Sequence, residues 1–211
     1  MFDIKEIIEC SAQEREYPEV RGDRYEHGFD CQTHIGQVLW CIAAHPEINT
    51  VLDFFTNTGS GSSLTIAHAQ QRSGGNKKLY GVEMKASREH RAKIEKNLEG
   101  YSSANILYGS VQNVLEHGQW REQIPEEVDL VCYDPDPPIA DWVFNFTLHE
   151  CRPKLWLMHN INYDEWESNF NNLMRGDEYE LVLKSASPEL IFREKCQEFA
   201  LFEKNESIPS S

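Results

Sequence analysis

Hydrophobic positions along the chain fall into short apolar runs that alternate with amphipathic segments. Each run is four to six residues long, which is typical of strands buried in a parallel sheet; the runs span residues 51–55, 79–83, 105–108, 128–133 and 154–158. Segments with helical spacing follow them at 62–72, 86–98, 111–117, 140–150 and 163–175. This alternation predicts an α/β protein with a Rossmann-like, doubly wound and mainly parallel sheet.

Two further apolar runs near the end of the chain, at 179–184 and 199–203, predict an antiparallel hairpin that brings the sheet to about seven strands. A strand or a turn is expected between them, around residues 190–192. The chain length suits one α/β domain and is too short for two of ordinary size. We therefore expect a single domain over residues 1–211.

Within this domain, we expect the Rossmann-like core to span residues 33–204, with helices at 3–16 and 33–45 before the first strand. The charged segment 15–30 between these helices is either a surface loop or a lid over the substrate. The polar tail 205–211 is expected to be disordered.

The charge and composition of the chain indicate which partners and which compartment to expect. A formal net charge of −15 disfavours binding to nucleic acid, whose phosphates attract an excess of Lys and Arg. The amino terminus lacks the pattern of a signal peptide, and no apolar stretch approaches the roughly 18 residues that span a membrane. The six cysteines are scattered without a C-x-x-C pair, so we expect reduced thiols in a soluble, cytoplasmic protein.

The first predicted strand leads into a polar loop at residues 56–61 and then into a helix that begins at Ser62. Gly59 and Gly61 allow a ligand to approach the backbone of this loop, and a helix amino terminus presents unpaired N–H groups to an anion. A strand, a glycine-containing loop and a helix in this order favour a nucleotide-type site, although such a stretch also occurs as a plain turn.

Glu83 ends the second predicted strand, about twenty residues beyond the loop. A carboxylate at this position can accept hydrogen bonds from both hydroxyls of a ribose. The alternatives are a helix N-cap and a surface salt bridge.

The fourth and fifth predicted strands end in Asp134 and Asp136, and in His159 and Asn160. Carboxylate and carbonyl oxygens suit Mg²⁺, whereas a histidine suits a softer metal or acts as a general base on a hydroxyl. The alternative is that these are loop acids beside a solvated histidine.

These motifs resemble those of the class I S-adenosylmethionine-dependent methyltransferases over about residues 33–204. Val51-Leu-Asp53 with the segment from Thr56 to Ser63 is similar to the first motif of that superfamily, and Gly81-Val-Glu83 is similar to its ribose-binding motif. The Asp-x-Asp stretch at 134–136 and the pair at 159–160 are closest to those of small-molecule O-methyltransferases.

The resemblance implies a cofactor site that the first strand, its loop and the next three strand ends share. The implied cofactor-binding residues are Asp53, Thr56, Gly59, Ser60, Gly61, Ser62, Glu83, Ser110 and Asp134. Asp134 and His159 are the implied catalytic residues. Asp134, His159 and Asn160 are the implied ligands of Mg²⁺ or another divalent cation, with Asp136 as a further candidate.

The sequence departs from the pattern of that superfamily at three places. Phe55 stands where relatives have a glycine two residues after the acid, and its ring is expected to narrow the cofactor pocket. Ser110 replaces an acid near the adenine, and Pro137 and Pro138 follow Asp136 where relatives carry a Lys or a His.

We therefore expect S-adenosylmethionine-dependent methyl transfer to a hydroxyl of a small molecule, with no nucleic-acid or membrane partner and with a homodimer left open. One alternative is a methyltransferase-fold protein without activity that acts as a binding subunit or scaffold. A nicotinamide-dependent oxidoreductase is a third and weaker reading, because the loop lacks the G-x-G-x-x-G pattern.

Overall fold

The structure of the chain is a computed structural model. It describes residues 3–13, 16, 18, 20–21, 33–54, 56–84, 87–110, 122–134, 139–159, 161, 164–185 and 199–207. None of the helices described over these ranges is long and apolar enough to cross a membrane.

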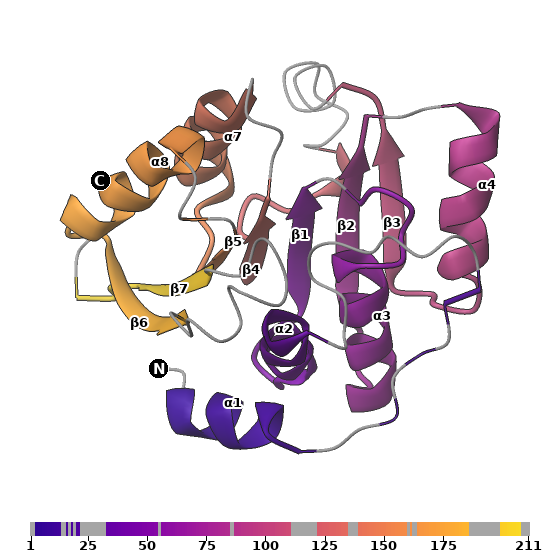
Figure 1. Cartoon of the computed structure of the whole chain (residues 1–211), viewed down its shortest axis with the longest axis horizontal. Helices are drawn as coiled ribbons and strands as arrows, with labels where there is room; N and C mark the ends of the chain where they lie inside the picture. The colour runs from indigo at the N-terminus through magenta and orange to yellow at the C-terminus, as the bar shows by residue number, and fades with distance from the viewer. Residues whose placement is uncertain are drawn as a thin grey trace.

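The described strands form one sheet in the order β3-β2-β1-β4-β5-β7-β6 (Figure 1). Their bounds are β1 (Thr50–Phe54), β2 (Lys78–Glu83), β3 (Ala104–Tyr108), β4 (Leu130–Tyr133), β5 (Leu155–His159), β6 (Tyr179–Ser185) and β7 (Phe199–Lys204). The first five are parallel, and β7 runs antiparallel to both β5 and β6. The predicted mainly parallel sheet with a closing antiparallel hairpin is confirmed.

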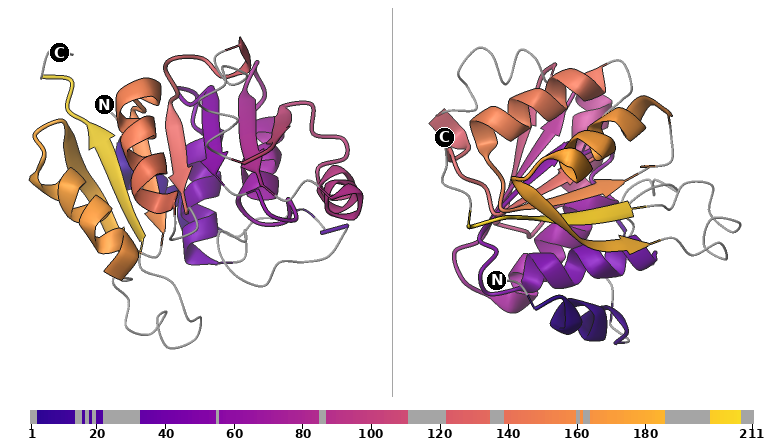
Figure 2. Two further views of the ribbon diagram at one scale, coloured as in Figure 1. Left: turned by 90° about the horizontal axis from the view of Figure 1, so that it is seen from above. Right: turned by 90° about the vertical axis from the view of Figure 1, so that its left-hand side faces the viewer.

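Helices cover both faces of the sheet, as the right-hand view in Figure 2 shows. One face carries α1 (Ile4–Ser11), α2 (His34–Ala44), α3 (Ser62–Ser73) and α4 (Arg88–Asn97); the other carries α7 (Ala140–Phe146) and α8 (Asp164–Arg175). Because side chains alternate along a buried strand, Val51 packs toward the first set of helices and Leu52 toward the second. The sheet therefore separates two hydrophobic cores.

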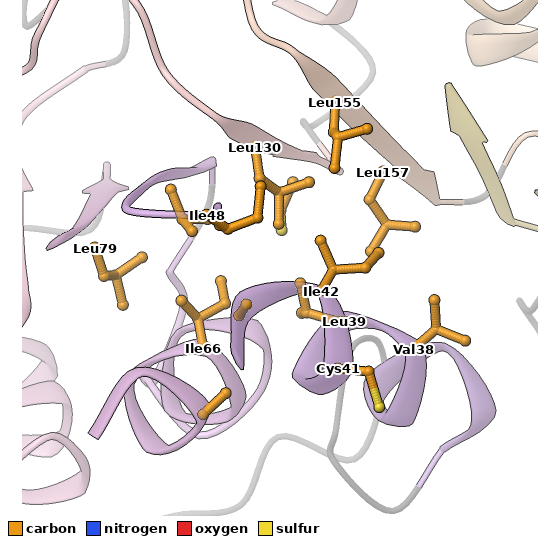
Figure 3. Packing of buried hydrophobic residues seen from close by; sticks show 14 of the residues in the cluster. Val38, Leu39, Cys41, Ile42, Ile48, Ile66, Leu79, Leu130, Leu155 and Leu157 are labelled. Atoms are coloured by element: carbon orange, nitrogen blue, oxygen red, sulfur yellow. The ribbon is translucent and has the colours of Figure 1, made fainter. Parts of the chain in front are cut away.

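Apolar side chains of α2 and α3 fill the first core against the strands (Figure 3). Leu39 and Ile42 of α2 and Ile66 of α3 lie in one cluster with side chains of β2, β4 and β5, and all three are fully buried. A buried aliphatic side chain of this size stabilises the fold by about 1.5–3 kcal/mol relative to an exposed one. This packing holds α3, and with it the loop that precedes α3, firmly on the sheet.

The helix predicted over 140–150 is α-helical at its start and π-helical at its end. The α-helix α7 ends at Phe146 and continues as the π-helical turn η2 (Thr147–Cys151). Thr147 Oγ1 donates to Val143 O at 2.7 Å, and the turn closes at Arg152 in a left-handed conformation with φ of 42°. A threonine that bonds back to the carbonyl four residues earlier loosens the regular helix at this point.

A buried lysine, Lys77, binds backbone carbonyls near the edge of the sheet that is formed by the amino-terminal ends of the parallel strands. Lys77 Nζ donates to the carbonyls of Ala43, His45 and Ile48, at 3.2, 2.5 and 2.7 Å. Asp129 accepts hydrogen bonds there from Asn49 N, Thr50 N and Lys154 Nζ. Backbone groups at this edge are thus satisfied by the protein's own side chains, whereas the predicted site residues lie at the opposite edge.

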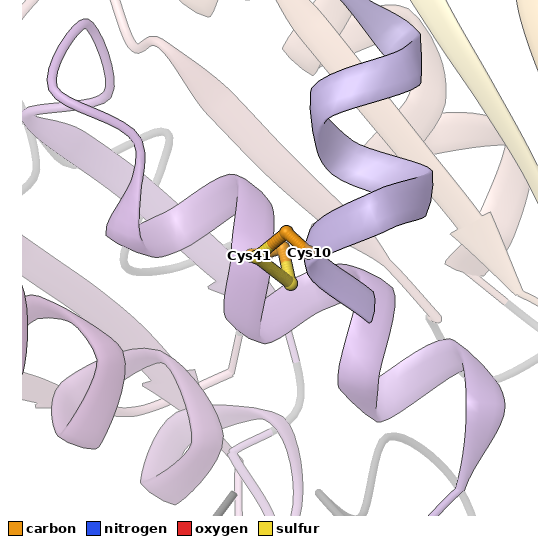
Figure 4. The surroundings of a disulfide bond; sticks show 2 residues. All are labelled: Cys10 and Cys41. Atoms are coloured by element: carbon orange, nitrogen blue, oxygen red, sulfur yellow. A yellow bond between two sulfur atoms is a disulfide. The ribbon is translucent and has the colours of Figure 1, made fainter. Parts of the chain in front are cut away.

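A disulfide joins Cys10 of α1 to Cys41 of α2 (Figure 4). The sequence-based expectation that all cysteines are reduced is therefore wrong for this pair. Scattered cysteines gave no sign of it, because α1 and α2 are brought together only by packing. Among the described residues, Cys132 and Cys151 are free and buried.

Several sequence predictions fall outside the described residues: the helix at 111–117, the strand or turn at 190–192 and most of the segment 15–30. Within the tail 205–211, the first residues are described, and Asn205 N donates to Glu178 O at 2.7 Å.

Candidate functional site

The carboxyl ends of β2, β1, β4 and β5 lie next to one another and carry Glu83, Asp53, Asp134 and His159. Because these strands are parallel neighbours, their ends meet at one edge of the sheet (Figure 1). The charges of both Asp134 and Glu83 act on the carboxyl of Asp53. The structure thus brings together acids that are far apart in the sequence, as the strand pattern predicts.

Asp53 is buried at the centre of this edge, with 1% of its surface exposed. Ser62 Oγ lies 2.9 Å from both of its carboxylate oxygens, and Ser63 Oγ donates to Oδ2 at 2.5 Å. Burial raises the pKa of Asp53 from an ordinary 3.8 to about 7; the two serines lower it, and the charges of Asp134 and Glu83 raise it further. Ser63 was absent from the predicted site residues, and its contact follows from the first turn of α3.

The loop between β1 and α3 is held by backbone hydrogen bonds, one to β2 and one within the loop. Thr56 N donates to Val82 O at 3.2 Å, and Gly59 N donates to Thr56 O at 2.9 Å. Asn57 and Gly59 both have left-handed backbones, with φ of 51° and 73°. Ser60 is buried, and its hydroxyl lies 2.8 Å from that of Thr58. A tight turn with two left-handed residues brings this backbone close to the ends of β1 and β2.

Gly81 of β2 makes room for the start of this loop. A Cβ at this position would collide with Thr56 Oγ1 and would lie 2.6 Å from Ile106 Cδ1. Thr56 Oγ1 is buried and makes no hydrogen bond to the described part of the chain. The glycine of the predicted ribose-binding motif is therefore required by the packing between the two motifs.

Glu83 ends β2 with 3% of its surface exposed. Gly109 N donates to its carbonyl at 3.0 Å, which fixes the end of β2 against the residue that follows β3. His90 Nε2 of α4 lies 3.6 Å from Glu83 Oε1. The N-cap of α4 is Ser87, so Glu83 is not a helix cap, and its burial excludes a surface salt bridge.

Asp134 and His159 form a pair across the ends of β4 and β5. His159 Nδ1 lies 3.2 Å from Asp134 Oδ2, and the histidine is buried with 2% of its surface exposed. The alternative of a solvated histidine is therefore wrong. Asp136 and Asn160 lie outside the described residues, and the described residues contain no group of three that could hold a metal.

Two further predicted positions, Ser110 and Gly61, lie next to elements that form this edge. Ser110 follows β3 and is exposed to solvent. Gly61 precedes α3, and Thr65 N donates to its carbonyl at 3.0 Å. Phe55 lies outside the described residues, so its expected narrowing of the pocket stays a prediction. The functional roles of all these residues likewise stay predictions.

Solved methyltransferase structures share this architecture. An O-methyltransferase from Bacillus cereus in complex with S-adenosylhomocysteine has 14% sequence identity and a TM-score of 0.65, over 85% of this chain and 84% of that one. The O-methyltransferase TomG from Streptomyces achromogenes, in complex with S-adenosylmethionine, has 15% identity and a TM-score of 0.63, over 80% of this chain and 78% of that one. The chain has the class I methyltransferase fold.

A fibrillarin structure shares the fold as well. Fibrillarin from Aeropyrum pernix, with S-adenosylmethionine bound, has 13% identity and a TM-score of 0.55, over 93% of this chain and 86% of that one. The sequence matches no protein-family model and no curated protein. The class I methyltransferase fold is thus established by architecture, and the chemistry has to be argued from the site.

Proposed function

We propose that the protein binds S-adenosylmethionine at the carboxyl edge of the sheet and transfers its methyl group to a hydroxyl of a small molecule. The observation that carries this proposal is the row of acids at adjacent strand ends, the buried Glu83 and Asp53 and the partly exposed Asp134, beside a glycine-containing loop. The similar folds with S-adenosylmethionine or S-adenosylhomocysteine bound support it.

The residues at this edge fit such a cofactor in charge and in hydrogen-bonding capacity. Two acids act on the buried carboxyl of Asp53, so a ligand with positive charge would stabilise its ionised form. Glu83 is placed to accept the hydroxyls of a ribose. Thr56 Oγ1 is buried and makes no hydrogen bond to the described residues, and a polar ligand would satisfy such a group.

Asp53, Glu83 and the amides of the loop would hold the cofactor, and the buried setting would keep water from it. When bound, the cofactor supplies an electrophilic methyl group on a positively charged sulfur. The protein's main task in such a reaction is to place the acceptor oxygen in line with that methyl group. Three carboxyls nearby would also favour the positive charge of the methyl donor over the neutral product.

Asp134 and His159 are the proposed catalytic pair. With Nδ1 facing Asp134 Oδ2 at 3.2 Å, the carboxylate favours a proton on Nδ1 and leaves Nε2 as the basic nitrogen. That nitrogen would take the proton of the acceptor hydroxyl as the methyl group is transferred. Asp134 therefore acts by orienting the base, as the acid of a catalytic triad does.

Divalent-metal assistance is an alternative role for this pair, because a histidine nitrogen that binds a metal cannot also accept the proton of the acceptor. Asp134 and His159 would be two of the ligands, with Asn160 next to His159 in the chain and Asp136 two residues after Asp134. The metal would polarise the acceptor hydroxyl. If methyl transfer continues undiminished in the presence of a strong chelator, the metal has no part in the reaction.

A methyltransferase-fold binding or scaffold protein without activity is the second candidate. The hydrogen bonds from Ser62 and Ser63 to Asp53 favour it, because they satisfy the buried carboxyl without any ligand. Such a protein needs the fold for stability and not for chemistry.

Titration calorimetry with S-adenosylmethionine, S-adenosylhomocysteine and NAD separates these functions, and we expect heat from the first two alone. Absence of binding at millimolar concentrations would refute the enzyme proposal. A second assay follows a labelled methyl group from S-adenosylmethionine into a panel of small hydroxylated acceptors. Binding without transfer to any acceptor would favour the scaffold function.

A further inference from the structure

One face of α4 contacts both the glycine-containing loop and the end of β2. His90, Ile94 and Asn97 lie on this face, since residues four and seven positions apart share one side of a helix. Ile94 packs on Gly59, where a Cβ would lie 3.3 Å from Ile94 Cγ2. Asn97 Nδ2 donates to Thr58 O at 2.8 Å. The same helix face thus supports the loop with two residues and reaches Glu83 with the third.

The start of α4 places His90 over the end of β2. Ser87 is the N-cap, and its Oγ accepts a hydrogen bond from His90 N at 3.2 Å. This cap fixes the first turn of the helix, in which side chains point back toward the amino terminus. His90 is directed in this way toward Glu83, which lies four residues before the cap.

His90 is half-buried beside Glu83, which is buried. The side chains are 13% and 4% exposed, and His90 Nε2 makes no hydrogen bond to the described residues. Its 3.6 Å separation from Glu83 Oε1 exceeds the length of a hydrogen bond. A buried N–H that lacks a partner costs about 1–3 kcal/mol, so any shift that shortens this contact is favoured.

We propose that His90 is a positioning residue for a ribose: its Nε2–H restrains the carboxylate of Glu83 in the orientation that receives two neighbouring hydroxyls of the ligand. The inference rests on the proposed function, since it concerns the same cofactor site. Each carboxylate oxygen has two lone pairs, so Oε1 can accept from His90 and from a hydroxyl at the same time. A shorter hydrogen bond from His90 Nε2 to Glu83 Oε1 would then favour binding of the hydroxyls, and binding of the hydroxyls would favour that hydrogen bond.

The test is a comparison of two ligands with variants of His90. Calorimetry is carried out with S-adenosylhomocysteine and with its 2′,3′-dideoxy analogue, which lacks the hydroxyls. His90→Ala should weaken binding of S-adenosylhomocysteine about tenfold, which is about 1.4 kcal/mol. Binding of the dideoxy analogue should change by less than about twofold, because Glu83 has no hydroxyl to hold in that complex.

Two further variants make the comparison specific. His90→Gln keeps an N–H donor of similar reach and should recover most of the lost affinity, whereas the shorter His90→Asn should not. Lys96→Ala is the control on α4, because Lys96 is exposed on that helix, and it should bind both ligands as the original protein does. If His90→Ala fails to fold, as judged by thermal unfolding, His90→Asn takes its place.

The outcomes are distinct. An unchanged affinity in His90→Ala would overturn the inference and leave the proposed function intact. Equal weakening for both ligands would also overturn it, because the histidine would then support the site as a whole. Absence of binding in the original protein would refute the proposed function, and the inference with it.

Discussion

Burial of the Asp53 carboxyl group disfavours its ionised form. Its oxygens accept hydrogen bonds from Ser62 and Ser63, yet burial and two neighbouring acids still raise its pKa to about 7. The unfolded chain releases this proton near pH 3.8, and the folded chain holds it until about pH 7. Because the folded state binds more protons between these values, this group lowers stability as the pH rises through that window.

Asp53→Asn should therefore stabilise the protein, increasingly so at higher pH. The amide resembles the neutral acid and does not ionise, so the gain over the original protein should grow by about 2–3 kcal/mol between pH 5 and pH 8. Denaturant unfolding of both proteins at the two pH values measures this difference. A gain that is the same at pH 5 and pH 8 would contradict the raised pKa.

At the scale of elements, β2 and the loop after β1 depend on each other through a single glycine. Gly81→Ala would press a methyl group against Thr56 Oγ1 and Ile106 Cδ1. Overpacking of this kind costs about 1–3 kcal/mol, and we expect that loss in chemical denaturation. Ile106→Val, which removes Cδ1, should recover part of the loss in the double variant. If Gly81→Ala is as stable as the original protein, the loop can shift away from the added methyl group without loss of stability, and the predicted overpacking is absent.

The hydrogen bond from α4 to the loop can be tested by a substitution of Asn97. Asn97 donates to Thr58 O from a buried side chain, and Asn97→Asp would replace the donor with an acceptor. We expect destabilisation by about 2–3 kcal/mol, because Thr58 O loses its partner and a buried carboxylate is placed beside it. Thermal unfolding with Lys96→Ala as the exposed control checks this. A loss no larger than that of the control would contradict the role of Asn97.

The sequence predicted those elements whose signal is local. Each parallel strand is an apolar run such as Val51 to Phe54, and Gly74 and Gly100 mark the turns after α3 and α4. The acids at the strand ends followed from the same pattern, because parallel strands place their ends together. The position of β7 between β5 and β6 did not follow, since two consecutive strands pair equally well in either order at an edge.

Contacts between distant elements were missed because they depend on how the elements pack and leave no local signal in the sequence. His90 looked like one residue of a charged helix, and its contact with Glu83 depends on how α4 packs. The pairing of Cys10 with Cys41 likewise depends on the approach of α1 to α2. A cap such as Ser87 followed by His90 three residues later is a local signal that could have directed attention to the first turn of α4.

For the whole molecule, the disulfide ties α1 to α2, a helix with most of its residues buried against the sheet. It closes a loop across a sequence separation of 31 residues, which includes the charged segment at 15–30. Disulfides persist in oxidising compartments, so this pairing gives no support to the cytoplasmic location expected from the sequence.

Cys10→Ser should lower the free energy of unfolding by up to about 4 kcal/mol, because the unfolded chain regains the freedom that the crosslink removes. Reductant should destabilise the original protein by a similar amount and should leave Cys10→Ser unchanged. Denaturant unfolding with and without reductant measures both effects. If reductant shifts the two proteins equally, the crosslink is not the cause.

In the proposed function, the row of acids at the carboxyl edge of the sheet binds an adenosyl cofactor. Calorimetric titration of S-adenosylhomocysteine into the original protein and into Glu83→Ala tests it most directly, with Glu89→Ala, an exposed acid on α4, as the control. We predict binding to the original protein and to the control, and an affinity at least about tenfold weaker, or about 1.4 kcal/mol, for Glu83→Ala. No binding to the original protein, or equal affinity for all three, would contradict the account.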